Sequence, residues 1–270
     1  MTLHQGVVAR SWVNRLLSVN GWLVFAFLYL PIVVVIVFSF SGSSIVGLWG
    51  GFSLRWYDRM FANESLMNAL RNSVWVALWS TLVSTVLGTA AALALDRYRR
   101  WIGRGVFDAV LYLPVIIPDV TMAVMLLLWF TSIDLPLGRG TITLAHIAFN
   151  ISFVAIVVRA RLANMDPAME EAAADLYANR WQAFRRVTLP LIMPGVLGGG
   201  LLALTLSLDD VVITSFVQGP GSTTLPVYVF GLIKRSVTPE INAVSTLMLA
   251  VSVGLVLASL AFQRRGTRRD

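Results

Sequence analysis

The sequence predicts an all-α integral membrane protein that forms one domain over residues 1–270 and crosses the membrane six times. The composition is the first reason: 57% of the residues are hydrophobic and 13% are charged, with a mean hydropathy of +0.76. A soluble domain of this length needs more charge on its surface. The second reason is that the apolar residues form long blocks, each able to cross about 30 Å of hydrocarbon at ~1.5 Å per helical residue. The expected spans are approximately 21–41, 70–95, 107–132, 141–160, 190–217 and 241–263.

The first span has no charged residue between Gly21 and Phe40. It is longer than the apolar part of a typical signal peptide, and no A-x-A cleavage site follows it, so we expect a retained helix. The outward segment 41–68 contains the amphipathic stretch SLRWYDRMF. Because Trp and Tyr favour the headgroup region, we expect this stretch to lie along the membrane interface.

Two spans are rich in proline. Pro114 and Pro118 predict a kink or an interruption in the third span. The fifth span begins with Pro190 and Pro194 and continues into a triple glycine, whose small size allows close helix packing. Irregular backbone within a membrane is tolerated beside protein or a water-filled path, so both spans are candidates for lining a pathway, with packing alone as the alternative.

The segment between the fifth and sixth spans, QGPGSTTLPVYVF, has turn-forming residues at 219–221 followed by a short apolar run. This run is a candidate for dipping back into the outer leaflet. Thr238, Pro239 and Glu240 then match a helix N-cap, a first-position proline and a first-turn carboxylate. They predict the start of the sixth span.

The net charge of +7 reflects membrane topology rather than a nucleic-acid surface. Arginines concentrate in the two terminal tails and in the second and fourth loops. By the positive-inside rule, both termini and the loop 166–190 are expected in the cytoplasm. The absence of cysteine excludes disulfides and thiolate chemistry, and two histidines without suitable spacing give no metal-site signal, so no cofactor is expected.

The loop 166–190 is predicted to form a pair of short helices at the membrane surface. Asp166 and Pro167 suit the N-cap and the first helical position, and a second helix is expected around Arg180–Val187, ended by Leu189 and Pro190. Such a helix pair can dock in a groove on another protein. The alternative, resting on lipid headgroups, is disfavoured by carboxylates near an anionic leaflet. The first helix carries an apolar stripe, with acids on the other side: Met169, Ala172, Ala173 and Leu176, against Glu170, Glu171 and Asp175.

The stretch EEAAADLYANRWQAFRRVTLP, from Glu170 to Pro190, resembles the EAA loop of ABC importer membrane subunits, which contacts the ATPase. Tyr177 departs from the family pattern, which usually has glycine there. A left-handed tyrosine costs roughly 1–2 kcal/mol, and Asn179 is the alternative residue for the turn. The resemblance implies that the residues coupling to the ATPase are Glu170, Glu171, Ala172, Ala173, Asp175, Leu176 and Tyr177.

Several stretches resemble the permease subunits of spermidine/putrescine ABC importers, the putrescine type most of all: RWYDRMF, RNSVWVAL, LPVIIPDV, LTLSLDDVVITSFVQGPGSTTLP and VTPEINAVSTL. The resemblance covers about Gly21 to Gln263 and implies the type I ABC importer permease fold. It implies a channel-forming subunit that translocates polyamines, putrescine or spermidine, across the bacterial inner membrane. The implied partners are a sister permease, a cytoplasmic ATPase dimer and a periplasmic polyamine-binding protein. No catalytic residue is expected in this chain. Lys234, the only lysine, lies outside a P-loop motif, so ATP hydrolysis is expected on a separate ATPase.

Three acids lie within the predicted spans: Asp119, Asp209 and Asp210. An Asp at the bilayer centre costs about 2.5–3.5 kcal/mol, so these carboxylates are candidates for a path taken by a cationic substrate. Neighbouring residues point about 100° apart on a helix, so Asp209 and Asp210 cannot both face that path squarely. The structural alternatives are a salt bridge to Arg71 or to the sister subunit, or a helix-end position that reaches water.

Two polar residues within the spans have less specific interpretations. Thr205, one turn before Asp209, is a candidate for orienting that acid. His146 is expected as a packed, hydrogen-bonded residue, with a proton relay as the alternative. The rival functions are an ABC permease for another cationic or small organic solute, and an ion-driven secondary transporter that uses the acids as proton relays.

Overall fold

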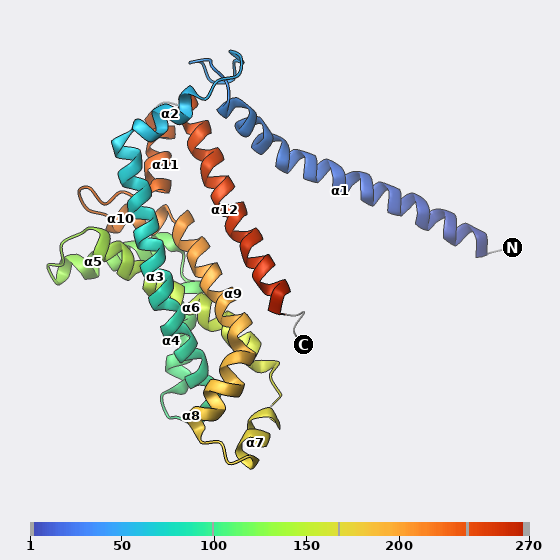
Figure 1. Cartoon of the computed structure of the whole chain (residues 1–270), viewed down its shortest axis with the longest axis vertical. Helices are drawn as coiled ribbons and strands as arrows, with labels where there is room; N and C mark the ends of the chain where they lie inside the picture. Colours follow the sequence, from blue (N-terminus) through green and yellow to red (C-terminus); the bar gives the residue numbers. More distant parts are fainter. Residues whose placement is uncertain (1–2, 99, 167, 236–237, 267–270) are drawn as a thin grey trace. The chain divides into compact units, whose positions relative to one another are not determined.

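The computed structural model describes residues 3–98, 100–166, 168–235 and 238–266, and these residues are mostly helical (Figure 1). Four residues on which the predicted helix start and topology depend lie outside the described residues: Pro167, Arg99, Arg268 and Arg269. In chain order the helices are α1 Leu3–Ser39, α2 Arg55–Ala62, α3 Glu64–Arg97, α4 Arg104–Ile116, α5 Asp119–Ser132, α6 Arg139–Ala163, α7 Ala168–Asp175, α8 Arg180–Ala183, the π-helix η1 Phe184–Thr188, α9 Leu189–Asp209, α10 Val212–Val217, α11 Leu225–Arg235 and α12 Pro239–Gly266.

The chain divides into two units, each with its own arrangement. The first contains α1, α2, α11 from Leu232 and α12 up to Val251. The second contains α3 to α10, α11 up to Gly231 and α12 from Ser252. In the first unit, the predicted amphipathic stretch forms α2, whose Trp56 and Met60 are buried. The Trp56 indole N–H donates to the Ser41 carbonyl at 2.9 Å, which satisfies its polar edge.

The second unit is built on α3, α6 and α9, which pack against one another (Figure 1). Glycines allow the close approach. A Cβ on Gly88 of α3 would lie 2.7 Å from the Val154 Cβ, and a Cβ on Gly199 of α9 would lie 3.3 Å from the Val154 Cα. Two helices therefore reach the same residue of α6, and the expected role of the triple glycine in packing is confirmed.

The third predicted span is interrupted, as Pro114 and Pro118 indicate. α4 ends at Ile116 and α5 begins at Asp119, with a bend of 113° between them. Ile117 is extended, with ψ 137°, because a residue before proline is pushed out of the helical region. The segment 107–132 is thus two helices rather than one.

Two boundaries around the fifth span differ from the prediction. The helix that begins at Arg180 was expected to end at Leu189 and Pro190, but it continues through η1 into α9. The Leu189 N–H bonds to the Phe184 carbonyl, five residues back, so a π-helical turn carries the chain into the proline without a break. The helix within the expected span 190–217 is also interrupted: α9 stops at Asp209, Asp210 is extended with ψ 124°, and α10 is a separate helix.

The segment after α10 turns back onto α3 within the second unit. Gly221 has φ +73° in the predicted turn, and the Asn72 amide donates to the Gly221 and Thr223 carbonyls at 3.0 and 2.9 Å. The Ser73 hydroxyl accepts the Leu225 N–H at 2.7 Å and so fixes the start of α11. These contacts anchor α11 to α3.

Among the described residues, four helices are long and apolar enough to cross a membrane, or five if the bent pair α4–α5 counts as one span. The four are Trp12–Ser39, Glu64–Arg97, Arg139–Ala163 and Arg180–Asp209. α12 covers the sixth expected span and begins at Pro239, as the sequence predicts. The membrane class is confirmed, and the number six stays a prediction.

Candidate functional site

The loop between α6 and α9 presents an unburied helix. The Asp166 carboxylate accepts the Ala168 N–H at 2.9 Å and caps α7, as the sequence predicts. No residue of α7 is buried. The apolar stripe is open to contact, with Met169 49% exposed and Leu176 82% exposed.

Tyr177 makes the turn between α7 and α8 itself. Its φ is +59°, in the left-handed region, and its side chain is 97% exposed. The Ala178 N–H donates to the Ala173 carbonyl at 3.1 Å, and the Tyr177 N–H donates to the Ala174 carbonyl at 2.9 Å. This pair of bonds is the Schellman arrangement, in which the residue past the helix end is usually glycine.

Asn179, the alternative residue for this turn, instead begins α8. Its φ of −72° and ψ of 165° are extended, so it does not turn the chain. Its side-chain oxygen accepts the Gln182 N–H at 2.8 Å, and the Gln182 side chain accepts the Asn179 N–H at 2.9 Å. The prediction that Asn179 makes the turn is therefore wrong, because its side chain and its N–H are both engaged in a reciprocal capping box.

The acids of α7 fall into two groups. Glu170 Oε1 lies 2.8 Å from Arg97 Nη2 at the end of α3, and the buried Thr188 hydroxyl donates to the same oxygen. Glu171 and Asp175 are exposed, and neither carboxylate forms an ion pair within the part of the chain that is described. Glu170 thus holds α7 to the end of α3 and to Thr188, the last residue of η1, while Glu171 and Asp175 are exposed.

Asp210 sits at the break between α9 and α10, and its carboxylate is largely engaged. It accepts the Thr214 N–H at 2.7 Å, the Thr214 hydroxyl at 2.7 Å and the Ile213 N–H at 3.3 Å. These bonds cap the start of α10. The His146 Nε2 lies 3.3 Å away, and the Asp210 side chain is only 11% exposed.

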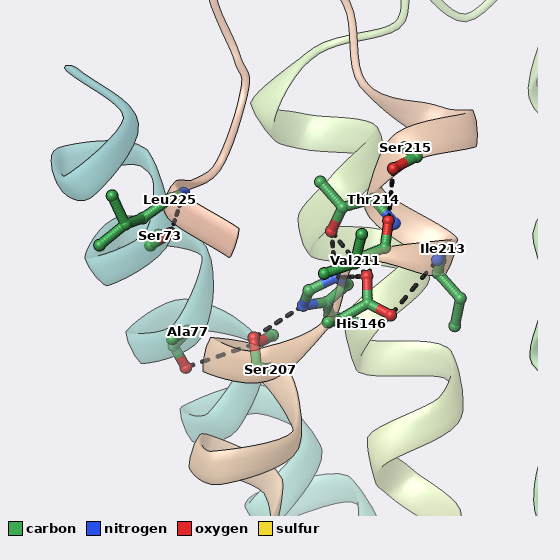
Figure 2. Close-up of polar contacts among 11 residues, drawn as sticks. Ser73, Ala77, His146, Ser207, Val211, Ile213, Thr214, Ser215 and Leu225 are labelled. Carbon is green, nitrogen blue, oxygen red and sulfur yellow. Dashed lines mark hydrogen bonds and ion pairs between the residues drawn. The ribbon is translucent and has the colours of Figure 1, made fainter. Parts of the chain in front are cut away.

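His146 on α6 is fully buried and uses both ring nitrogens (Figure 2). Nδ1 lies 2.7 Å from the Ser207 hydroxyl, and Nε2 lies 3.0 Å from the Thr214 hydroxyl. Ser207 in turn lies 3.1 Å from the Ser80 hydroxyl on α3. The expectation of a packed, hydrogen-bonded histidine is confirmed.

The hydroxyl residues around His146, Ser80, Ser207 and Thr214, were not predicted from the sequence. Single Ser and Thr residues are common in apolar helices, so Ser80 and Ser207 carry no distinct signal. The spacing of Asp210 and Thr214 is the one usable hint, because an acid can cap a helix whose first turn holds a hydroxyl four residues later.

Asp209 and Asp119 differ from Asp210. Both are exposed, Asp209 as the last residue of α9 and Asp119 as the first of α5. In the described ranges, neither carboxylate forms an ion pair, with Arg71 or any other residue. Thr205 donates to the Leu201 carbonyl at 2.9 Å, so its hydroxyl proton is directed within its own helix rather than at Asp209. The described residues contain no group of three or more acids or histidines arranged to hold a metal ion.

Comparison of the chain with known proteins identifies a matching family. Residues 84–269 match the family described as "Binding-protein-dependent transport system inner membrane component". The chain is 43% identical over 238 residues to the putrescine transport system permease protein PotI of Escherichia coli K12, covering 86% of this chain and 84% of that protein. It is 39% identical over 244 residues to the spermidine/putrescine transport system permease protein PotC of Haemophilus influenzae, covering 90% and 95%.

A solved structure shares the fold. A chain of a bacterial ABC transporter involved in the import of the acidic polysaccharide alginate has a TM-score of 0.77 at 20% identity, covering 97% of this chain and 98% of that one. The same kind of transporter in complex with an alginate pentasaccharide-bound periplasmic protein gives a TM-score of 0.74 at 19% identity, covering 96% of each chain. At this identity the likeness is one of helical architecture.

Proposed function

Because this chain belongs to the family of binding-protein-dependent transport system inner membrane components, we propose that it is the channel-forming permease subunit of an ATP-driven polyamine importer. Putrescine is the first candidate substrate and spermidine the second. The names of the relatives PotI and PotC, and their sequence identity to this chain, support this substrate class. The proposed topology has six spans, with the pair α4–α5 as the third and α12 as the sixth. Both termini and the loop 166–190 lie in the cytoplasm.

The observation that carries the proposal is the exposed α7–α8 loop. It follows one apolar helix, leads into another, and presents an apolar stripe beside outward carboxylates, with no residue of α7 buried. An unburied amphipathic helix of this kind fits a groove on a partner. The partner proposed here is a cytoplasmic ATPase dimer, docked through the coupling residues that centre on Glu171.

The other proposed partners belong to the same importer. A sister permease completes the channel, and a periplasmic polyamine-binding protein delivers the substrate. The solved alginate transporter bound to a periplasmic protein supports such an arrangement. ATP hydrolysis takes place on the separate ATPase, whose closure moves the coupling loop and switches the channel between its inward and outward states.

Two exposed acids at the helix breaks, Asp119 and Asp209, belong to the proposed substrate path. Asp210 lies beside Asp209 at the same break, and its carboxylate is bonded to the start of α10. A carboxylate in a membrane costs about 2.5–3.5 kcal/mol, and a passing diammonium offsets that cost for the time of its passage. These acids therefore suit a cation better than an anion.

The test is uptake of radiolabelled putrescine by proteoliposomes that hold the complete complex, with ATP inside and the loaded binding protein outside. Glu171→Ala should lower ATP-dependent uptake about tenfold, equivalent to ~1.4 kcal/mol of lost docking, while the complex still co-purifies. Glu64→Ala is the matched control, because Glu64 is an exposed acid outside the loop. Its uptake should equal that of the wild type.

Other results assign other functions. Uptake that ignores ATP and follows a proton gradient would identify an ion-driven carrier and overturn the proposal. ATP hydrolysis that is stimulated by a different loaded binding protein, without polyamine uptake, would keep the importer and replace its substrate.

A further inference from the structure

One histidine, His146, forms hydrogen bonds to residues on both sides of the break between α9 and α10. Ser207, two residues before Asp209, bonds to His146 Nδ1, and Thr214, in α10, bonds to His146 Nε2. Figure 2 shows the imidazole reaching from α6 to both hydroxyls. Asp209 lies between Ser207 and Thr214 in the chain, so its position depends on these two hydrogen bonds.

The donors and acceptors of this cluster fit one consistent pattern. A carboxylate can only accept, so the Thr214 hydroxyl donates to Asp210 and its oxygen accepts from His146 Nε2–H. His146 Nδ1 then accepts from the Ser207 hydroxyl, and the single Ser80 hydroxyl proton lies within reach of both the Ser207 oxygen at 3.1 Å and the Ala77 carbonyl at 3.3 Å. Thr214 and Ser207 each have one donating role, and both ring nitrogens of the buried His146 are engaged.

Asp210 has little left to offer a substrate. Two backbone N–H groups and one hydroxyl donate to its carboxylate, and the imidazole lies against it. A substrate ammonium would have to displace these bonds from a side chain that is only 11% exposed. Asp209, one residue earlier, is exposed and forms no ion pair within the described chain.

We infer that His146, Thr214 and Asp210 are positioning residues, which fix the α9–α10 break and so present Asp209 as the carboxylate that meets the cationic substrate. This inference rests on the proposed function. It divides two adjacent acids, identical in type, into one that holds the backbone and one that contacts the cargo. Charge is essential only at Asp209, while hydrogen-bond acceptance is essential at Asp210.

The experiment measures putrescine transported per ATP hydrolysed in proteoliposomes of the complete complex. Asp209→Asn should lower this ratio roughly tenfold, since one charge-assisted contact is lost, while ATP hydrolysis stays near the wild-type rate. Asp210→Asn keeps a capping oxygen, so its ratio should stay within about twofold of the wild type. Asp210→Ala should resemble Asp209→Asn.

Two further comparisons separate positioning from simple destabilisation. Thr214→Val removes the hydroxyl and should lower the ratio, whereas Thr214→Ser keeps it and should restore the ratio. The double variant of Asp209→Asn with Asp210→Ala should be no worse than either single variant, because the second residue acts through the first. Multiplying effects would overturn the inference, as would a loss in Asp210→Asn equal to that in Asp209→Asn.

A measurement without substrate keeps the inference separate from the proposed function. The chain has no cysteine, so Val211→Cys places a single thiol of this chain in the break. Labelling of that thiol by a water-soluble maleimide should accelerate at least threefold when Asp210→Ala or Thr214→Val is added. It should not accelerate with Asp210→Asn or Thr214→Ser. If the complex carries no putrescine, the substrate proposal fails while faster labelling still supports the network; equal labelling in all variants refutes it.

Discussion

Replacing Tyr177 with glycine should stabilise the turn that joins α7 to α8. Tyr177 holds φ +59°, and a left-handed L-residue costs roughly 1–2 kcal/mol. Glycine removes that strain but loses about 0.5–1 kcal/mol through greater freedom in the open state. The tyrosine ring is 97% exposed, so its removal sacrifices little burial. A net gain of about 0.5–1 kcal/mol remains.

Hydrogen exchange measures this gain at one amide. The Ala178 N–H is bonded to the Ala173 carbonyl only while the turn is closed, so its exchange reports local opening. In Tyr177→Gly it should exchange about two to five times more slowly, after correction for intrinsic rates. Tyr177→Ala is the control, because it removes the ring and keeps the strained backbone, and its exchange should match the wild type.

Two outcomes would refute the reasoning about Tyr177. Exchange in the glycine variant that is as fast as in the wild type would mean that left-handed strain does not dominate the turn. Equal slowing in the alanine variant would assign the effect to the ring rather than to the backbone.

Two more predictions concern the loop and the second unit. Glu170→Ala should speed amide hydrogen exchange in α7 by a few-fold at low salt, because an exposed ion pair contributes up to about 1 kcal/mol. High salt should shrink the difference between the variant and the wild type. A difference that does not depend on salt would assign the effect to the Thr188 hydrogen bond alone. Gly219→Ala should lower the thermal midpoint of the complex, because a Cβ there would lie 1.9 Å from the Leu137 carbonyl oxygen and overpacking costs roughly 1–3 kcal/mol. Gly231→Ala, with nothing within 4 Å of its new Cβ, should leave the midpoint unchanged or raise it, and equal losses in both would contradict the steric argument.

Local patterns predicted the loop 166–190 well where neighbouring residues decide its structure. The Asp166 cap, the apolar stripe of α7 and the interruption near Pro118 all follow from residues within one or two helical turns. The continuation past Pro190 did not follow, because a π-helical turn accommodates the proline in a way that no nearby residue signals. The inward direction of Glu170 was also missed, since its partner Arg97 comes from a distant helix.

The acids at the breaks show the same limit. Three acids are recognisable from the sequence as costly in a membrane, Asp119, Asp209 and Asp210, but nothing in the sequence separates the last two. The separation depends on where α9 stops and on His146, which lies 61 residues from its partner Ser207 in the chain.

The sequence by itself determined the membrane class, most of the helices and the exposed loop. Hydrocarbon offers no hydrogen bonds, so a spanning backbone must satisfy its own in long apolar helices, and such helices are visible in composition alone. Only the tertiary structure decided which polar side chains are engaged. Packing α3, α6 and α9 together brings Ser80, His146 and Ser207 into one buried chain, which ends at Asp210 and leaves Asp209 exposed.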